Sequence, residues 1–156
     1  MKTILVPVDF SRATDAVVAQ AVDLAEAVSA RVVLLHIILP PVMVAEYGAL
    51  MGRIDEIRVA GEKAAGVMLE RLQKTCERRG LTVDTRQFTG SVVALIAEQA
   101  KTLGADFIVI GSHGHTALYD LFVGSTTHGV LRRAPCPVLV VPPAKRTPVR
   151  KARKKK

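Results

Sequence analysis

Four nearly unbroken apolar runs most constrain the fold of this chain. They cover residues 2–8, 31–39, 107–110 and 138–141. A strand that is covered on both faces has a continuous apolar sequence, whereas a strand with one wet face alternates between apolar and polar residues. The four runs therefore predict buried strands of a mostly parallel sheet. Residues 81–88 do alternate, which predicts a fifth strand, half exposed and at an edge.

Helical patterns lie between the predicted strands. Ser11 is the predicted N-cap of the first helix, and Gly80 is the predicted end of a long second helix that runs to about Arg79. Residues 42–52 fit either a flap or the first turns of that second helix. The apolar residues of these patterns are Val17, Ala21, Leu24, Ala25 and Val28, on one face of the first helix, Ile54, Ile57, Gly61, Ala64, Ala65, Met68 and Leu72, which mark the long second helix, and Val93, Ile96, Ala97 and Ala100, on one side of the third.

The order of these elements predicts an open α/β sheet with five strands, four helices and right-handed crossovers. A length of 156 residues is about one domain's worth. We expect one domain over residues 1–144, without an internal repeat. Residues 145–156 are too rich in charge to fold and form a separate basic tail.

A glycine-rich stretch follows the 107–110 strand. Gly111 and Gly114 lie three residues apart, and Gly124 and Ser125 open the short helix that ends near Arg133. Glycines allow a sharp turn and a close approach of the backbone to a ligand. A helix start with free amides attracts phosphate, because the amides and the helix dipole point the same way. The stretch predicts a phosphate-binding loop at the end of a strand; an ordinary tight loop is the alternative.

This Gly-x2-Gly-x9-Gly-Ser spacing resembles the signature of the universal stress protein family, and specifically of its ATP-binding branch. Residues 4–11 (ILVPVDFS) resemble the opening strand of that family, and residues 134–142 (APCPVLVVP) resemble its closing strand. The resemblance covers roughly residues 2–143. It implies an adenine nucleotide alpha hydrolase-like fold with strand order 3-2-1-4-5 and helices on both faces of the sheet.

In such a sheet the ligand lies beyond the carboxyl ends of the strands, at the point where the strand order reverses. That point would bring Asp9 and the glycine loop into one crevice. The resemblance implies ATP, with or without Mg²⁺, as the ligand. The residues implied for nucleotide binding are Pro7, Val8 and Asp9 for adenosine, a backbone group near Ile37 for the base, Gly111, His113 and Gly114 for ribose and phosphates, and Gly124, Ser125 and Thr126 for phosphates.

Some residues have other interpretations or depart from the family pattern. Asp9 would also suit a cap of the first helix, and His113 with His115 has the spacing of a metal site but no evident third ligand. His36 is interpreted as a partly buried structural histidine. Phe10 stands where many relatives have glycine, and no arginine lies between the two loop glycines, which leaves the preference for ATP or ADP open.

The net charge of +8 is confined to the tail. Residues 145–156 contain eight basic and no acidic side chains, and the remaining 144 residues carry 14 of each sign. The tail is interpreted as a solvated extension; docking to nucleic acid or to an anionic lipid surface is the alternative. The composition thus predicts no basic binding face on the folded part.

The location is predicted to be the cytoplasm. No apolar segment reaches the roughly 18 residues of a membrane span, and the first residues enter a strand pattern without a cleavable leader. Cys76 and Cys136 form no C-x-x-C motif, which favours two buried, reduced thiols, with Cys136 serving in packing.

The leading functional prediction is an ATP-binding stress-response regulator or interaction module. The sequence has no Walker lysine and no evident general base beside a nucleophile, so we expect at most slow ATP hydrolysis; an ATPase or nucleotide-transferring enzyme is the alternative. The resemblance implies a homodimer through the last strand, Val138, Leu139, Val140 and Val141. This strand is apolar and has no charge that would protect a sheet edge from pairing.

Overall fold

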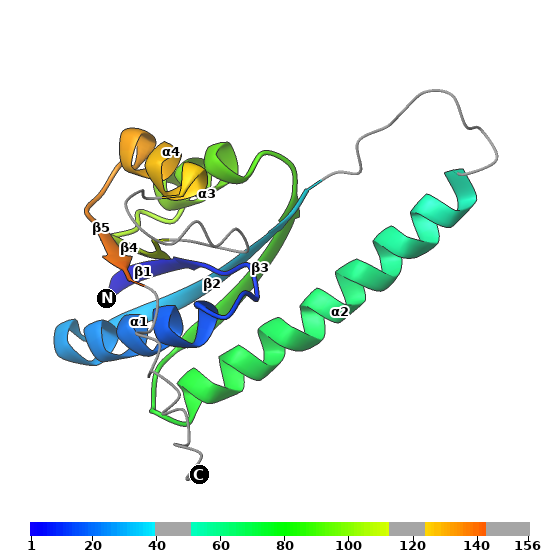
Figure 1. Ribbon diagram of the computed structural model, residues 1–156. Helices are drawn as coiled ribbons and strands as arrows, with labels where there is room; N and C mark the ends of the chain where they lie inside the picture. Colours follow the sequence, from blue (N-terminus) through cyan, green and yellow to red (C-terminus); the bar gives the residue numbers. More distant parts are fainter. Residues whose placement is uncertain (40–50, 113–123, 143–156) are drawn as a thin grey trace, which may run out of the picture.

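Five parallel strands form one open sheet in the order β3-β2-β1-β4-β5 (Figure 1). The computed structural model describes residues 1–39, 51–112 and 124–142, with four helices in these ranges. The predicted strand order and alternation of elements are confirmed. The elements are β1 (Lys2–Pro7), α1 (Thr14–Val28), β2 (Ala30–Ile38), α2 (Met51–Glu77), β3 (Val83–Thr89), α3 (Val92–Thr102), β4 (Phe107–Gly111), α4 (Ser125–Arg133) and β5 (Val138–Val141).

Helices cover both faces of the sheet, α1 and α2 on one face and α3 and α4 on the other (Figure 1). Successive side chains of a strand point to opposite faces, so each central strand feeds both cores. In β1, Ile4 and Val6 pack with α1, whereas Leu5 packs with Ile96 of α3 and Val130 of α4. This two-sided burial is the physical reason for the unbroken apolar runs.

The start of α1 differs from the prediction. The helix begins at Thr14 with Ala13 at its cap, and no side chain bonds to the capping position. Ser11 instead closes the turn before the helix: its Oγ accepts the Ala13 N–H at 3.3 Å, and its carbonyl oxygen accepts the Thr14 N–H at 3.0 Å. Ser11 is therefore not the N-cap, because the chain makes an extra turn before it becomes helical.

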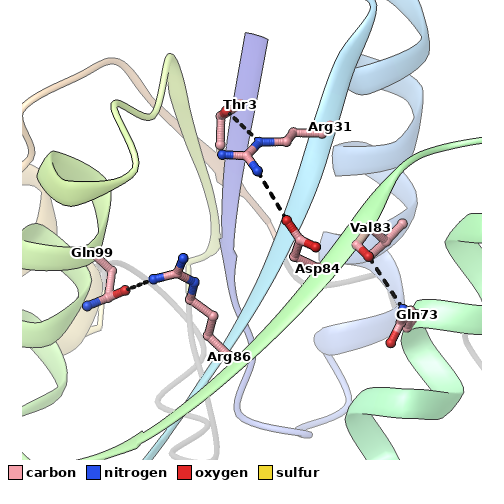
Figure 2. Close-up of polar contacts among 7 residues, drawn as sticks. All are labelled: Thr3, Arg31, Gln73, Val83, Asp84, Arg86 and Gln99. Atoms are coloured by element: carbon pink, nitrogen blue, oxygen red, sulfur yellow. Dashed lines mark hydrogen bonds and ion pairs between the residues drawn. The ribbon is translucent and has the colours of Figure 1, made fainter. Parts of the chain in front are cut away.

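A chain of polar contacts joins the amino ends of the first three strands (Figure 2). Arg31 Nε donates to Thr3 Oγ1 at 3.0 Å, and its Nη1 lies 3.2 Å from Asp84 Oδ2. The Thr3 N–H donates to Asp106 Oδ2 at 2.8 Å, and the Asp106 N–H donates back to the Thr3 carbonyl at 2.8 Å. These contacts close this end of the sheet.

Two glutamines anchor the edge strand β3 to helices (Figure 2). On one face, Arg86 Nη1 donates to Gln99 Oε1 in α3 at 2.9 Å. On the other, Gln73 Nε2 in α2 donates to the Val83 carbonyl at 3.4 Å. Gln99 is only 5% exposed, and the apolar pattern predicted for α3 had not placed it inside. The buried amide oxygen of Gln99 has a hydrogen-bond partner, because it accepts from Arg86.

Both cysteines are free, and their surroundings differ. Cys76 is fully buried against the α1–α2 core, and burial, followed by the nearby charge of Glu77, raises the pKa of its thiol. Cys136 is only partly buried, so the prediction of two buried thiols is wrong for this residue. Its partial burial, with Asp106 nearby, also raises its thiol pKa. In the described parts of the chain, no helix is long and apolar enough to span a membrane.

Candidate nucleotide site

The turn after β1 is shaped by a carboxylate. Val8 continues the pairing with β2, because its N–H donates to the Leu35 carbonyl at 2.8 Å. Asp9 Oδ1 then accepts the Ser11 N–H at 2.9 Å and the Thr14 hydroxyl at 3.4 Å. Asp9 thus has a structural role where the chain enters α1, and its predicted contact with adenosine stays a prediction.

Phe10 and His36 fasten this turn to β2. Phe10 has φ +58°, a left-handed conformation that glycine adopts at much lower cost. Its ring lies against the His36 imidazole, with the centroids 4.4 Å apart. Nδ1 of His36 is 2.9 Å from the Val8 carbonyl oxygen. The Phe10–His36 contact therefore offsets part of the backbone cost, and His36 has the partly buried structural position expected for it.

The carboxyl end of β4 is fastened to α4 by short hydrogen bonds. The Thr127 hydroxyl donates to the Gly111 carbonyl at 2.7 Å. The Ser112 N–H donates to the Val141 carbonyl, and the Gly124 N–H donates to the Ser112 carbonyl, both at 2.8 Å. The start of α4 is thus held beside the ends of β4 and β5.

The first turn of α4 is suited to bind an anion. Its N-cap is Gly124, which has no side chain to cover the helix amides. Ser125 and Thr126 are exposed in this turn and offer hydroxyl donors beside the backbone N–H groups. The helix dipole adds partial positive charge at the same place.

The Asp9 turn, the end of β4 and the start of α4 line one cavity of about 640 Å³. That volume lies within the range of pockets that hold small ligands and cofactors. The cavity brings together eight of the residues predicted for the site: Pro7, Val8, Asp9, Ile37, Gly111, Gly124, Ser125 and Thr126. The reversal of strand order between β1 and β4 is the reason, since it leaves their carboxyl ends as neighbours with α1 and α4 on opposite faces.

The cavity has an apolar part and a polar part. Side chains of β2 and α3 form much of the apolar wall, among them Leu35, Ile37, Val92 and Ile96. The polar part comprises the Asp9 turn and the start of α4. Among the lining residues that the structure describes, none is lysine or arginine. The described part of the cavity therefore offers an anion neutral donors and the helix dipole.

Several lining residues were not predicted from the sequence. Val92 and Ile96 come from α3, which follows the edge strand β3 in the chain but packs over the central strands. Gly61 of α2 also reaches the cavity. Thr127 is 3% exposed and positions Gly111 rather than an expected phosphate. Its place in the Gly-Ser-Thr-Thr run was the only signal, and that signal does not separate a buried hydroxyl from exposed ones.

Other predictions fall outside the described residues. His113, Gly114 and the His113–His115 metal alternative lie in residues 113–123, and most of the predicted flap lies in residues 40–50. The basic tail also lies outside, so its anionic partner stays a prediction. Among the residues that are described, no group of three or more His, Cys, Asp or Glu side chains could hold a metal ion.

The model of the universal stress protein family matches residues 1–142. The chain belongs to the universal stress protein family. A putative universal stress protein of Staphylococcus haemolyticus is 32% identical over 142 residues, which are 90% of this chain and 84% of that protein. The Bacillus subtilis universal stress protein YxiE is 34% identical over 88 residues, 56% of this chain and 60% of YxiE. A Mycolicibacterium smegmatis relative is 33% identical over 88% of this chain, which spans only 47% of that protein.

Solved structures of universal stress proteins have the same fold. UspA from Lactobacillus plantarum superposes with a TM-score of 0.80 at 29% identity, covering 90% of this universal stress protein and 97% of UspA. More distant structures were solved in complex with cAMP (22% identity, TM-score 0.69) and, from Archaeoglobus fulgidus, with dAMP (20% identity, TM-score 0.63). They cover 92% and 90% of this chain and 98% of their own, and at these identities they establish the fold alone.

Proposed function

We propose that this universal stress protein binds an adenine nucleotide, ATP with Mg²⁺, in the cavity between the Asp9 turn and the start of α4. The bound nucleotide would make it a stress-response regulator or interaction module in the cytoplasm. One observation carries the proposal: the carboxyl ends of β1 and β4 and the first turn of α4 line a single cavity. Relatives solved with cAMP and dAMP support the choice of an adenine nucleotide.

The two parts of the cavity fit the two parts of a nucleotide. The base would lie against the apolar wall formed by Leu35, Ile37 and Ile96, with Asp9 in reach of the ribose hydroxyls. The phosphates would lie at Ser125 and Thr126, where amides, hydroxyls and the helix dipole all favour negative charge.

The charge of the cavity predicts a role for Mg²⁺. The described lining residues include no lysine or arginine, and the sequence of residues 113–123 contains neither. Three phosphates would therefore meet no lysine or arginine among these residues, and Mg²⁺ would neutralise part of their charge. We expect Mg²⁺ to strengthen ATP binding more than AMP binding.

Calorimetry of the purified full chain with ATP, ADP and AMP, with and without Mg²⁺, tests the proposal. Product analysis over several hours should follow on the same samples. Binding with little ADP formed is the expected result. Sustained turnover would instead support the enzyme alternative. Absence of binding to all three nucleotides would overturn the proposal and leave the glycine stretch as an ordinary loop.

We also propose a homodimer through β5. This strand lies at the edge of the sheet, and Leu139 is 41% exposed. The carbonyls of Pro137 and Val141 accept from β4, so by alternation Val138 and Val140 direct their backbone groups to the open edge. Val140→Pro would remove one outward donor and should halve the mass measured by light scattering. An unchanged mass would place any dimer contact elsewhere.

A further inference from the structure

Helix α2 has a second apolar side that the fold does not use. Its inner side buries Ala65, Leu69 and Cys76. Val67 and Met68, at other positions around the helix, are 61% and 43% exposed. Figure 1 shows α2 at the outside of its layer, with no labelled helix or strand beyond it. Val67 lies on the outer side together with exposed alanines, and a contiguous apolar surface of this kind is suited to a contact.

One stripe of residues runs along this outer side. Its members are spaced by 4, 4, 3 and 4 positions, which keeps them on one side of an α-helix. All are exposed, and the stripe is about 22 Å long at 1.5 Å per residue. We call it the outer stripe; it comprises Glu56, Ala60, Ala64, Val67 and Arg71.

The two ends of the outer stripe carry opposite charges. Glu56 lies at the amino end and Arg71 at the carboxyl end, and neither has an ion-pair partner among the described residues. Two ion pairs form within the same helix: Arg58 Nη1 lies 2.7 Å from Glu62 Oε1, and Lys74 pairs with Glu70. Lys63 is exposed beside the stripe and has no ion-pair partner among the described residues. The stripe is therefore small and apolar in the middle, with opposite charges at its ends that pair with none of the described residues.

We propose that the outer stripe is an interface at which α2 packs antiparallel against α2 of a second copy of this chain. A two-fold axis midway between positions 63 and 64 places Ala60 opposite Val67 of the second copy and Glu56 opposite Arg71 of the second copy. Small residues meet large ones, and the two ion pairs repeat by symmetry. A parallel arrangement would instead bring like charges together, so the charge pattern favours the antiparallel one.

This interface lies away from the β5 edge. Helix α2 packs on β2 and β3, and β3 and β5 are the two opposite edges of the sheet. The residues of the outer stripe neither line the cavity nor belong to β5. The α2 contact is short for a protein interface, so we expect an association that depends on concentration. Two monomers would form a dimer through it, and a β5 dimer, which has two outer stripes, would associate further through both.

Charge reversal on the full chain tests the proposal by sedimentation velocity across a concentration series. Glu56→Arg alone and Arg71→Glu alone should each weaken the association at least tenfold, because each places two like-charged pairs at the interface. The double variant E56R/R71E should regain the wild-type association, since the pairs are restored with exchanged signs. An equimolar mixture of the two single variants should regain it as well, because E56R supplies two positive ends and R71E two negative ones.

Matched controls change the same charges on another helix. Glu98→Arg and Lys101→Glu alter exposed residues of α3, on the other face of the sheet, and should leave the association unchanged. The proposal is overturned if wild type and all α2 variants sediment alike, or if the single variants lose the association and neither the double variant nor the mixture regains it. In the second case the stripe would face a different partner, such as another protein or a lipid surface.

Nucleotide titration of the same variants separates this proposal from the proposed function. Neither Glu56 nor Arg71 lines the cavity, so their variants should bind nucleotide like the wild type. Loss of association with intact nucleotide binding supports the α2 interface, whatever the outcome of the test of the cavity.

Discussion

The two ends of the sheet differ in what their polar groups contact. At the amino ends of β1, β2 and β3, polar side chains bond to one another: Arg31 bridges Thr3 and Asp84, and Asp106 accepts the Thr3 N–H. At the carboxyl ends of β1 and β4, a cavity of about 640 Å³ is left open, with an uncapped helix start beside it. Polar groups that are satisfied within the chain add stability, whereas polar groups that face a cavity are available to a ligand. The amino ends of the strands therefore stabilise the sheet, and the carboxyl ends form the proposed binding site.

Gly124→Val should have the largest effect, on binding alone. Gly124 has φ −56° and ψ 155°, which valine can adopt, so the fold should stay intact. The added side chain would lie where the phosphates are expected, and we expect ATP affinity to fall at least about 100-fold, or about 2.7 kcal/mol. Calorimetry with ATP checks the prediction. Gly66→Val, on the exposed side of α2, is the matched control and should bind normally; normal binding by Gly124→Val itself would refute the phosphate assignment.

Gly129→Ala should come next, because it disturbs the position of α4. A Cβ at this position would lie 2.8 Å from Cγ2 of Val93 in α3, too close for two carbon atoms. We expect a loss of about 2 kcal/mol in the free energy of unfolding, as for other overpacked contacts, and weaker nucleotide binding because the helix start moves. Denaturant unfolding measures the first effect. The double variant G129A/V93A should regain most of the stability, and failure to do so would rule out this contact as the cause.

Asp9→Asn should separate the two roles of this residue. Its amide oxygen can still accept the Ser11 N–H, so the turn should survive, while the charge near the expected ribose is lost. We expect about tenfold weaker nucleotide binding, or about 1.4 kcal/mol, with little change in stability. Asp9→Ala should lose stability as well, because the turn then lacks its acceptor. If Asp9→Asn binds nucleotide normally, Asp9 is a structural residue only.

Thr3→Val should have the smallest effect, on stability alone. The change removes the hydroxyl that accepts from Arg31 Nε and keeps the backbone bonds to Asp106. We expect a loss of about 1 kcal/mol in the free energy of unfolding. Nucleotide affinity should stay within about twofold of wild type, or about 0.4 kcal/mol, because distant sites without shared partners act nearly independently. A large loss of affinity would contradict the division between the two ends.

The sheet could be predicted from the sequence because its strands carry the signal locally. The predicted run 138–141 has the same bounds as β5. The predicted runs 2–8 and 31–39 begin and end within one residue of β1 and β2. Continuous apolar residues can be accommodated only where both faces are covered. The strand order was implied by the family resemblance, not by these patterns.

Other features depend on contacts that a local pattern does not contain. Ser11 has the chemistry of an N-cap, but the bonds from Asp9 to Ser11 and Thr14 add a turn before the helix. Gln99 is polar in a helix and is still buried, because Arg86 reaches it from a strand that precedes it by 13 positions. Neither outcome follows from the residue types alone.

The sequence by itself determined which segments become strands and helices, and it contained the glycines and hydroxyls of a phosphate-binding helix start. These properties are local, since they follow from periodicity and from the chemistry of single residues. Only the tertiary structure decided that Asp9, Ile37 and Ser125 share one cavity, that α3 supplies its apolar wall, and that one side of α2 is left uncovered. The reason is that the reversal of strand order brings distant segments together, and the distances between them are set by packing rather than by spacing along the chain.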